Sequence, residues 1–204
     1  GLDAAPIEVA PDGVELAPPI TAEERMRARA RWGIAADAPV AGYVASLTAE
    51  KGHDLLLEAF AELRRATPSC RLLLAGSGPL QNLLQEKARA AGLLPAVHFA
   101  GFVEDPRPVY AACDTFLFPS LREGLGSSLL SAMSCALPVV ALDGGAIADI
   151  LQDGRNGLVV QPAAAPLAAA AALLFSDPGL ARRLGEAARE TVNAHFSAEG
   201  MVEA

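Results

Sequence analysis

The segment that decides the fold reads DTFLFPS (114–120), LREGLGSSLLSAMSCALP (121–138) and VVAL (139–142). It predicts a buried strand, a glycine-rich turn, a helix that begins at two serines and a second buried strand. A glycine-rich turn between a parallel strand and a helix directs free backbone N–H groups, and the positive end of the helix dipole, to one point. A diphosphate suits that point, and the acid Glu123 between its glycine neighbours suits sugar hydroxyls. The segment therefore predicts a site for a sugar nucleotide.

Strands and helices alternate along the rest of the chain. Strands are expected at 40–47, 71–75, 97–102, 115–118, 138–142 and 157–160, where the sequence is mainly apolar. Helices are expected at 22–32, 51–66, 79–91, 106–113, from 127 onward, and at 144–151, 166–175 and 178–194. Apolar strands separated by amphipathic helices are typical of a parallel sheet covered on both faces. The sequence therefore predicts a doubly wound, Rossmann-like α/β fold.

Length and composition predict one domain behind a leading segment. The chain has 204 residues, which is enough to bury a good core. Residues 1–32 are expected to form a connector and a short helix, because they hold two proline-rich segments followed by a charged stretch. Residues 33–204 are expected to form the Rossmann-like domain.

Charge, hydropathy and cysteine content exclude several classes of protein. A net charge of −8 would repel a polyanion, so no nucleic-acid partner is expected. The chain has no run of about 20 apolar residues, so no transmembrane segment is expected. Cys70, Cys113 and Cys135 are odd in number and lack CxxC spacing, which argues against a disulfide framework or a zinc site. They favour a reducing, cytoplasmic location.

One segment imitates a dinucleotide-binding fingerprint. The sequence GSGPLQ (76–81) follows a strand and opens a helix, as such a motif would. However, the third glycine, which allows close helix–strand packing, is replaced by Gln81, and Pro79 lies inside the motif. A tight turn with a proline at a helix start explains this segment without a ligand. Nicotinamide or flavin binding is therefore not expected.

Six short segments carry a family resemblance. In order they are AEKGH (49–53), AGSGP (75–79), HFAGF (98–102), FPSLREGLG (118–126), ALDGGA (141–146) and DGRNGL (153–158). Together they make nearly the whole chain resemble the C-terminal, donor-binding domain of a family-4 glycosyltransferase.

The resemblance implies an activity and a missing partner domain. Such enzymes have the GT-B fold, need no metal or other cofactor, and transfer a hexosyl group from a nucleoside-diphosphate sugar with retention of configuration. They serve carbohydrate, polysaccharide or glycolipid biosynthesis. Their N-terminal domain binds the acceptor and has no counterpart here, so this chain alone is expected to bind the nucleotide sugar and turn over poorly. Peripheral membrane contact would come through that missing half.

The resemblance also assigns site residues. Lys51 matches the lysine that pairs with the donor phosphates and offsets charge on the leaving diphosphate, and Glu123 matches the acid that contacts the transferred sugar. The matching substrate-binding positions are Gly101, Phe102, Val103, Gly124, Leu125, Gly126, Ser127 and Ser128. The first three would hold the base, and the next three would bring backbone N–H groups near the sugar and diphosphate. For the two serines, an N-cap role is the alternative.

Two positions depart from the family pattern. An arginine often precedes the lysine by five residues, and Ser46 stands there; the second acid, which binds the ribose, is replaced by Ser131. Loss of a charged hydrogen bond costs roughly 1.5–3 kcal/mol, on the order of tenfold to a hundredfold in affinity. A serine at 131 would reach the ribose directly only if the sugar lies deeper, or else through water. Both changes suggest a donor pocket that is weakened, specialised or degenerate.

Several alternatives stay open at this stage. The chain would also fit a non-catalytic sugar-nucleotide-binding or scaffold module, a GT-B epimerase or phosphorylase, or an unrelated Rossmann oxidoreductase. His53 is expected to be a capping or surface residue rather than a base, and His98 and His195 are expected to be structural. Gly144 and Gly145 are expected to open a helix; they would bring its N-terminus toward the site, although a turn explains them equally well. The base, the sugar and the acceptor are not identified by the sequence.

Overall fold

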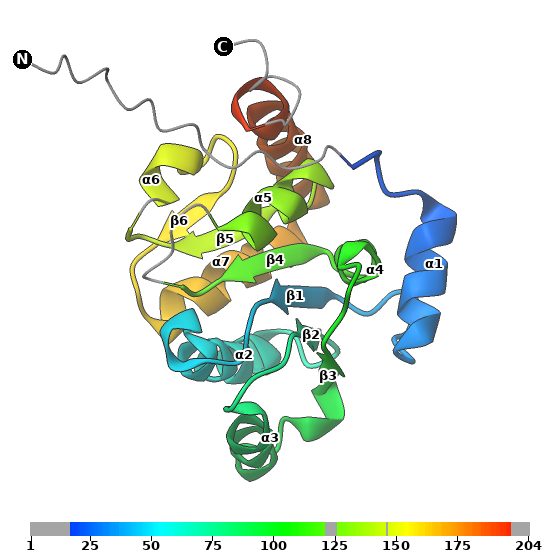
Figure 1. The fold of residues 1–204 in the computed structure, drawn as a ribbon, viewed down its shortest axis with the longest axis vertical. Helices are drawn as coiled ribbons and strands as arrows, with labels where there is room; N and C mark the ends of the chain where they lie inside the picture. Colours follow the sequence, from blue (N-terminus) through cyan, green and yellow to red (C-terminus); the bar gives the residue numbers. More distant parts are fainter. Residues whose placement is uncertain (1–16, 121–125, 146, 197–204) are drawn as a thin grey trace, which may run out of the picture.

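The computed structural model describes residues 17–120, 126–145 and 147–196, and its centre is a six-stranded sheet (Figure 1). The strands are β1 (Val40–Val44), β2 (Arg71–Ala75), β3 (Val97–Gly101), β4 (Thr115–Phe118), β5 (Val139–Leu142) and β6 (Leu158–Val160). Their order across the sheet is β3-β2-β1-β4-β5-β6, and every neighbouring pair is parallel. The predicted doubly wound α/β fold is confirmed.

Helices connect the strands and cover the sheet. They are α1 (Ala22–Arg31), α2 (His53–Ala66), α3 (Gln81–Ala90), α4 (Arg107–Ala112), α5 (Ser127–Ser134), α6 (Ile147–Ile150), α7 (Ala164–Ser176) and α8 (Pro178–His195), with 3-10 turns η1 (Ala49–Lys51) and η2 (Leu94–Ala96). Helix α7 packs against α2 and contacts β4, β5 and β6, whereas α5 packs against α8, β4 and β5. Within the described ranges, no single helix is long and apolar enough to cross a membrane; α7 and α8 meet that criterion only as a pair bent by 105°.

Several element boundaries differ from the predictions, and three of the differences lie at the connections around the sheet's carboxyl edge. Strand β1 was expected to reach residue 47 but ends at Val44, after which Ala45 and Leu47 donate to the carbonyls of Ala75 and Ser77. The helix expected from residue 51 begins at His53, because Gly52 takes a left-handed φ of 70° and separates η1 from α2. Helix α6 begins at Ile147 rather than at Gly144, since Gly144 and Gly145 both have positive φ.

The strand order reverses direction at β1, and this is where a ligand is expected. From β1 the chain proceeds outward to β2 and β3, then returns to the other side of β1 with β4. In open α/β sheets, ligands bind at the carboxyl ends of the strands beside such a reversal. Strand β1 pairs with β2 from Val40 to Val44 and with β4 at Ala41 and Gly42. A ligand-binding site is therefore expected at the carboxyl end of β1.

Aromatic side chains pack beneath that reversal point. The ring centroid of Tyr43 lies 6.0 Å from that of Phe116 and 6.2 Å from that of Phe118. Tyr110 on α4 lies edge-on to Phe116, at 5.7 Å. All four side chains are buried, and burial of each ring contributes roughly 1.5–3 kcal/mol relative to exposure. The carboxyl ends of β1 and β4 thus rest on a rigid layer.

The cysteines are small core residues, as predicted. All three are free and buried. Burial raises the pKa of the Cys70 thiol to about 11, which keeps this thiol protonated at neutral pH. Cys113 packs against β1 so closely that a Cβ on Gly42 would lie 2.3 Å from its Sγ. The sheet and the start of β4 approach one another there because position 42 carries no side chain.

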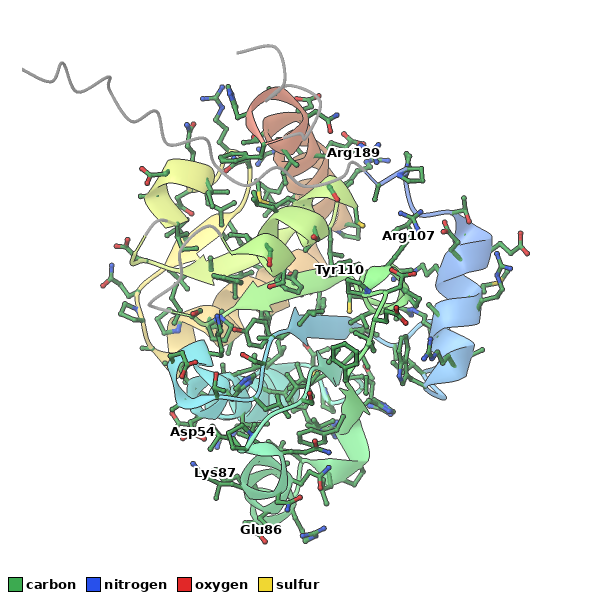
Figure 2. All side chains as sticks on the ribbon, in the orientation of Figure 1. Asp54, Glu86, Lys87, Arg107, Tyr110 and Arg189 are labelled. Atoms are coloured by element: carbon green, nitrogen blue, oxygen red, sulfur yellow. The ribbon has the colours of Figure 1, made fainter. Side chains whose placement is uncertain are left out.

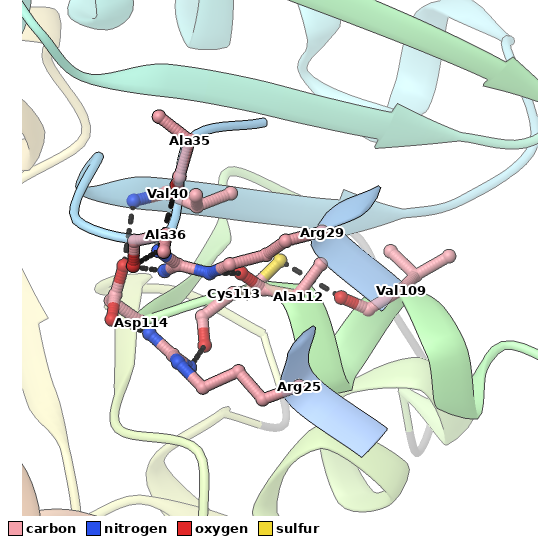
Figure 3. Close-up of polar contacts among 9 residues, drawn as sticks. All are labelled: Arg25, Arg29, Ala35, Ala36, Val40, Val109, Ala112, Cys113 and Asp114. Atoms are coloured by element: carbon pink, nitrogen blue, oxygen red, sulfur yellow. Dashed lines mark hydrogen bonds and ion pairs between the residues drawn. The ribbon is translucent and has the colours of Figure 1, made fainter. Parts of the chain in front are cut away.

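Helix α1 is fastened to the sheet by an ion-pair network (Figure 3). Asp114, the residue before β4, pairs with Arg25 and Arg29 from α1 and accepts a 2.8 Å hydrogen bond from the backbone N–H of Val40. The Arg29 guanidinium is buried, and it also donates to the carbonyl oxygens of Ala112, Ala35 and Ala36. A buried charge needs such partners, because desolvation without them is costly. The network therefore joins the leading helix to the amino ends of β1 and β4.

Further polar contacts between helices lie nearer the surface (Figure 2). Arg107 on α4 donates from Nε to Glu24 of α1 at 2.9 Å, and this pairing holds the pKa of Glu24 at about 2. Lys87 on α3 reaches Asp54 on α2 at 2.7 Å. Helix α1 therefore packs on α4. The division between a connector at residues 1–32 and a domain at residues 33–204 stays a prediction.

Candidate functional site

A cavity of about 380 Å³ opens at the carboxyl edge of the sheet, beside the reversal point. Its lining comes from the ends of β1, β2 and β3, from η1 and from the start of α5. The lining residues are Tyr43, Val44, Ala45, Ser46, Lys51, Gly76, Ser77, Phe102, Val103, Ser127 and Ser128. Six of the residues predicted from the sequence meet here: Ser46, Lys51, Phe102, Val103, Ser127 and Ser128. They come from three separate segments of the chain: the connection from β1 to α2, the loop after β3 and the start of α5.

The other predicted residues fall into two groups. Gly101 and Gly126 are not in the lining, but each immediately precedes a lining residue and has a left-handed φ, 71° for Gly101 and 63° for Gly126. Ser131 lies one turn further along α5, half-buried, and the structure does not bring it to the cavity. Glu123, Gly124 and Leu125 lie outside the described residues, so their predicted roles stay predictions.

Sequence reasoning missed five lining residues. Tyr43, Val44 and Ala45 were expected to lie within a strand, and Gly76 and Ser77 were interpreted as a turn that needs no ligand. The turn is real, since Gly76 has a φ of 139°. It also follows β2, and the carboxyl ends of parallel strands share one edge of a sheet. Gly76 and Ser77 could therefore have been predicted as lining residues from their position directly after a parallel strand.

The segment between β1 and α2 brings Ser46 and Lys51 to the cavity. Its backbone continues along the turn after β2: the N–H of Leu47 donates to the carbonyl of Ser77 at 3.0 Å. The N–H of Lys51 closes η1 on the carbonyl of Thr48 at 3.3 Å. Gly52 then turns the chain into α2, at a point where a Cβ would lie 2.2 Å from the carbonyl oxygen of Pro119. Only glycine fits that close approach, so the sequence KG sets the position of the lysine.

The start of α5 provides backbone donors. Gly126 is the N-cap, so the alternative that Ser127 or Ser128 caps this helix is wrong. The carbonyl of Gly126 accepts from the N–H groups of Leu129 and Leu130, at 2.8 and 3.1 Å. The N–H groups of an α-helix's first turn have no intrahelical acceptor and point out of its N-terminus. Because Ser127 and Ser128 line the cavity, this end of the helix dipole faces it.

His53 is buried, which corrects the prediction of a capping or surface histidine. Its side chain is 2% exposed, and its Nε2 lies 2.8 Å from the carbonyl oxygen of Ser46. The ring centroid lies 5.4 Å from that of Tyr43. Burial lowers the pKa of His53 below its ordinary value of 6.5, against the smaller opposing effect of its hydrogen bond to Ser46. His98 and His195 do not line this cavity.

This lowered pKa predicts how stability depends on pH. As pH falls below 6.5, the unfolded chain takes up a proton at His53 before the folded chain does. The contribution of His53 to the free energy of unfolding should therefore be fully present above pH 6.5. Below that pH the free energy of unfolding should decrease, by at most about 1.4 kcal/mol per pH unit from this residue. The contribution of the Glu24–Arg107 pair to stability should be lost at lower pH, as the pH falls from 4.5 towards about 2. Urea unfolding at several pH values measures both.

The control for this pH dependence is His53→Gln, which keeps a donor of similar reach and removes the titrating ring. The variant should show a flatter profile just below pH 6.5 and an unchanged profile below pH 4.5. An equally steep decrease in the variant would contradict the assignment to His53.

Comparison with known proteins adds three findings. The model of the family described as Glycosyl transferases group 1 matches residues 24–191. The chain is 34% identical over 180 residues to the alpha-D-kanosaminyltransferase of Streptomyces kanamyceticus, covering 87% of this chain and 46% of that protein. It is 34% identical over 198 residues to the GDP-mannose-dependent alpha-(1-6)-phosphatidylinositol monomannoside mannosyltransferase of Mycolicibacterium smegmatis, covering 91% and 51%.

A solved structure agrees with these matches. The crystal structure of Anabaena Alr3699/HepE in complex with UDP superposes with a TM-score of 0.83 at 25% identity, covering 90% of this chain and 51% of that one. The chain thus spans about half the length of the relatives it matches.

Proposed function

The chain belongs to the glycosyl transferases group 1 family, and from this premise we propose that its cavity holds the nucleoside-diphosphate sugar donor of a hexosyl transfer. The transfer would retain configuration at the sugar and need neither a metal nor another cofactor. The acceptor would be bound by a further, N-terminal domain. A cytoplasmic location belongs to the same proposal and rests on the free cysteines.

One observation carries the proposal: a cation, a helix N-terminus and an exposed aromatic side chain line the same cavity. They are Lys51, the first turn of α5 at Ser127 and Ser128, and Phe102. Together they suit two parts of a nucleotide sugar. The cation and the helix N-terminus suit the diphosphate, and an aromatic face suits a base.

The ammonium of Lys51 would act on the leaving group. When the bond between the sugar and the diphosphate breaks, negative charge develops on the diphosphate oxygens. A fixed cation and backbone N–H groups aimed at that charge stabilise it more in the transition state than in the ground state. Ser46, Ser77, Ser127 and Ser128 line the same cavity. A serine hydroxyl can donate a hydrogen bond to a phosphate oxygen.

The base would lie against the loop after β3. Phe102 is 75% exposed although it is a large apolar residue, and Val103 beside it also lines the cavity. Stacking on an aromatic face is worth roughly 1–3 kcal/mol per base. A bound base would also cover this side chain.

Matches to relatives support the choice of a donor. The two matched transferases act on sugars, the mannosyltransferase depends on GDP-mannose, and HepE was crystallised with UDP. Glu123 is proposed to contact the transferred sugar. Ser131 in place of an acid, away from the cavity lining, favours a second candidate: a non-catalytic module that binds a sugar nucleotide weakly.

Calorimetric titration of the folded chain with UDP, GDP and ADP tests the proposal. One nucleotide should bind, with a dissociation constant between micromolar and millimolar. In Lys51→Ala its affinity should fall by about tenfold to a hundredfold, the worth of one charged hydrogen bond. Chelation with EDTA should leave the affinity unchanged.

Lys87→Ala is the matched control, because Lys87 pairs with Asp54 on the surface and does not line the cavity. It should bind as the unmodified chain does. Absence of heat with all three nucleotides, or equal affinities in Lys51→Ala and Lys87→Ala, would overturn the donor site. Sugar transfer after joining an N-terminal domain would separate the enzyme from the non-catalytic module.

A further inference from the structure

Two buried rings fasten the segment that carries Ser46 and Lys51. The hydroxyl of Tyr43, near the end of β1, donates to the backbone carbonyl of Lys51 at 3.0 Å. His53, the first residue of α2, contacts the carbonyl of Ser46 through Nε2 at 2.8 Å. The two rings are tilted by 52° to one another, with their centroids 5.4 Å apart. One ring pair therefore holds both ends of the segment from Ser46 to Lys51.

The hydrogen bond fixes which nitrogen of His53 carries a proton. A carbonyl oxygen only accepts, so Nε2 must donate. Nδ1 is buried and has no hydrogen-bond partner among the described residues. The groups whose charges act on the ring are Asp54 on α2 and Glu50 and Lys51 on η1. Burial disfavours the charged ring, so His53 serves as a neutral donor to one backbone carbonyl.

Packing alone does not require these polar groups. Tyr43 is fully buried and His53 nearly so, beside apolar side chains such as Phe118. A leucine and a phenylalanine would fill similar volumes without burying polar atoms. The two polar atoms instead satisfy the carbonyls of Ser46 and Lys51, the two predicted phosphate-side residues of this segment.

We propose that His53 and Tyr43 are positioning residues of the donor site, which hold Ser46 and Lys51 at the separation that a nucleoside diphosphate requires. The inference rests on the proposed function. A lysine side chain is long and flexible, so the position of its backbone is one of the factors that determine where its ammonium lies. Without the two bonds, the segment would still be tied to Ser77 through Leu47, to Ser120 through the carbonyl of Glu50, and closed by η1, but its two end carbonyls would lose these hydrogen bonds to the buried rings.

Calorimetry with matched ligands separates positioning from general damage. The probes are the nucleoside diphosphate that binds, among UDP, GDP and ADP, and the corresponding nucleoside. The variants are His53→Leu, Tyr43→Phe and His53→Gln, of which only the last keeps a donor at the position of Nε2. The matched control is His98→Leu, the same change at a histidine on β3 that does not line the cavity.

His53→Leu and Tyr43→Phe should each weaken diphosphate binding by about tenfold and leave nucleoside binding within about twofold. His53→Gln should restore the diphosphate affinity to within about threefold of the original, and His98→Leu should leave it within about twofold. In a Lys51→Ala background, His53→Leu should weaken diphosphate binding by less than about threefold, because the group it positions is gone.

Two results would overturn the inference while leaving the donor site intact. One is an equal loss of diphosphate and nucleoside affinity. The other is a full tenfold effect of His53→Leu in the Lys51→Ala background. Failure of the unmodified chain to bind any of the three diphosphates would overturn the donor site and, with it, the inference. Thermal unfolding of each variant shows whether it is still folded. If the His53 variants are unfolded, the ratio of diphosphate to nucleoside affinity in Tyr43→Phe decides the inference.

Discussion

Gly76→Ala should lower the free energy of unfolding by about 2–6 kcal/mol, because backbone strain and overpacking both act at this position. Gly76 has a φ of 139°, a conformation that residues with a side chain rarely adopt. An added Cβ would lie 1.8 Å from the carbonyl oxygen of Ala45 and 2.8 Å from its carbonyl carbon. Both are backbone atoms, so no rotamer change relieves the clash. Urea unfolding followed by circular dichroism measures the loss.

The same substitution should impair nucleotide binding, since Gly76 and Ala45 both line the cavity. Gly92→Ala is the matched control: Gly92 also has a left-handed φ, 69°, but an added Cβ would have no atom within 4 Å. It should cost only about 1–2 kcal/mol from the backbone conformation and leave binding unchanged. Equal losses of stability in the two variants would show that the close approach to Ala45 is not what requires glycine at position 76.

Asp114→Ala should have a comparably large effect on stability. It removes the carboxylate that pairs with Arg25 and Arg29 and that accepts from the N–H of Val40. Breaking a buried ion pair costs about 3–5 kcal/mol, because an uncompensated charge stays buried. The lower end of that range applies here, since backbone carbonyls still accept from Arg29. A loss of about 3 kcal/mol is large beside a typical domain stability of about 5–15 kcal/mol.

Glu23→Ala serves as the control for this network. It breaks an ion pair of the same helix, with Arg27 at 3.6 Å, whose two side chains are mostly exposed. Such a surface pair is worth less than about 1 kcal/mol. If Asp114→Ala cost no more than Glu23→Ala in urea unfolding, the buried network would not be what anchors α1.

The sequence predicted the fold because its strands are short apolar runs and its helices are amphipathic, and both patterns agree with the final structure. The prediction failed where a strand ends earlier than its sequence pattern suggests. Ala45 and Ser46 continue an apolar strand pattern, yet the chain there turns along Ser77 and lines the cavity. No local pattern shows such a departure, because it depends on a neighbouring strand's turn.

The candidate site was predicted in the same uneven way. Lys51 and the serines of α5 lie at strand–helix junctions, where parallel sheets gather ligand contacts, so their position follows from topology. His53 was mistaken for a capping or surface residue, although it shares an apolar helical stripe with Leu56, Leu57 and Phe60. That spacing predicts burial. The acceptor of its hydrogen bond could not be predicted, because Ser46 reaches it only through the turn of the folded chain.

The contact between Gly42 and Cys113 has a consequence for how this sequence can evolve. The two positions are far apart in the chain but share one small volume, in which a Cβ on residue 42 would lie 2.3 Å from Sγ and 3.3 Å from Cβ of Cys113. An alanine at 42 is therefore incompatible with cysteine at 113 but nearly compatible with alanine there. Substitutions at one position would act as suppressors of substitutions at the other. Across descendants of this chain, the two sites should change together, although neither lines the cavity.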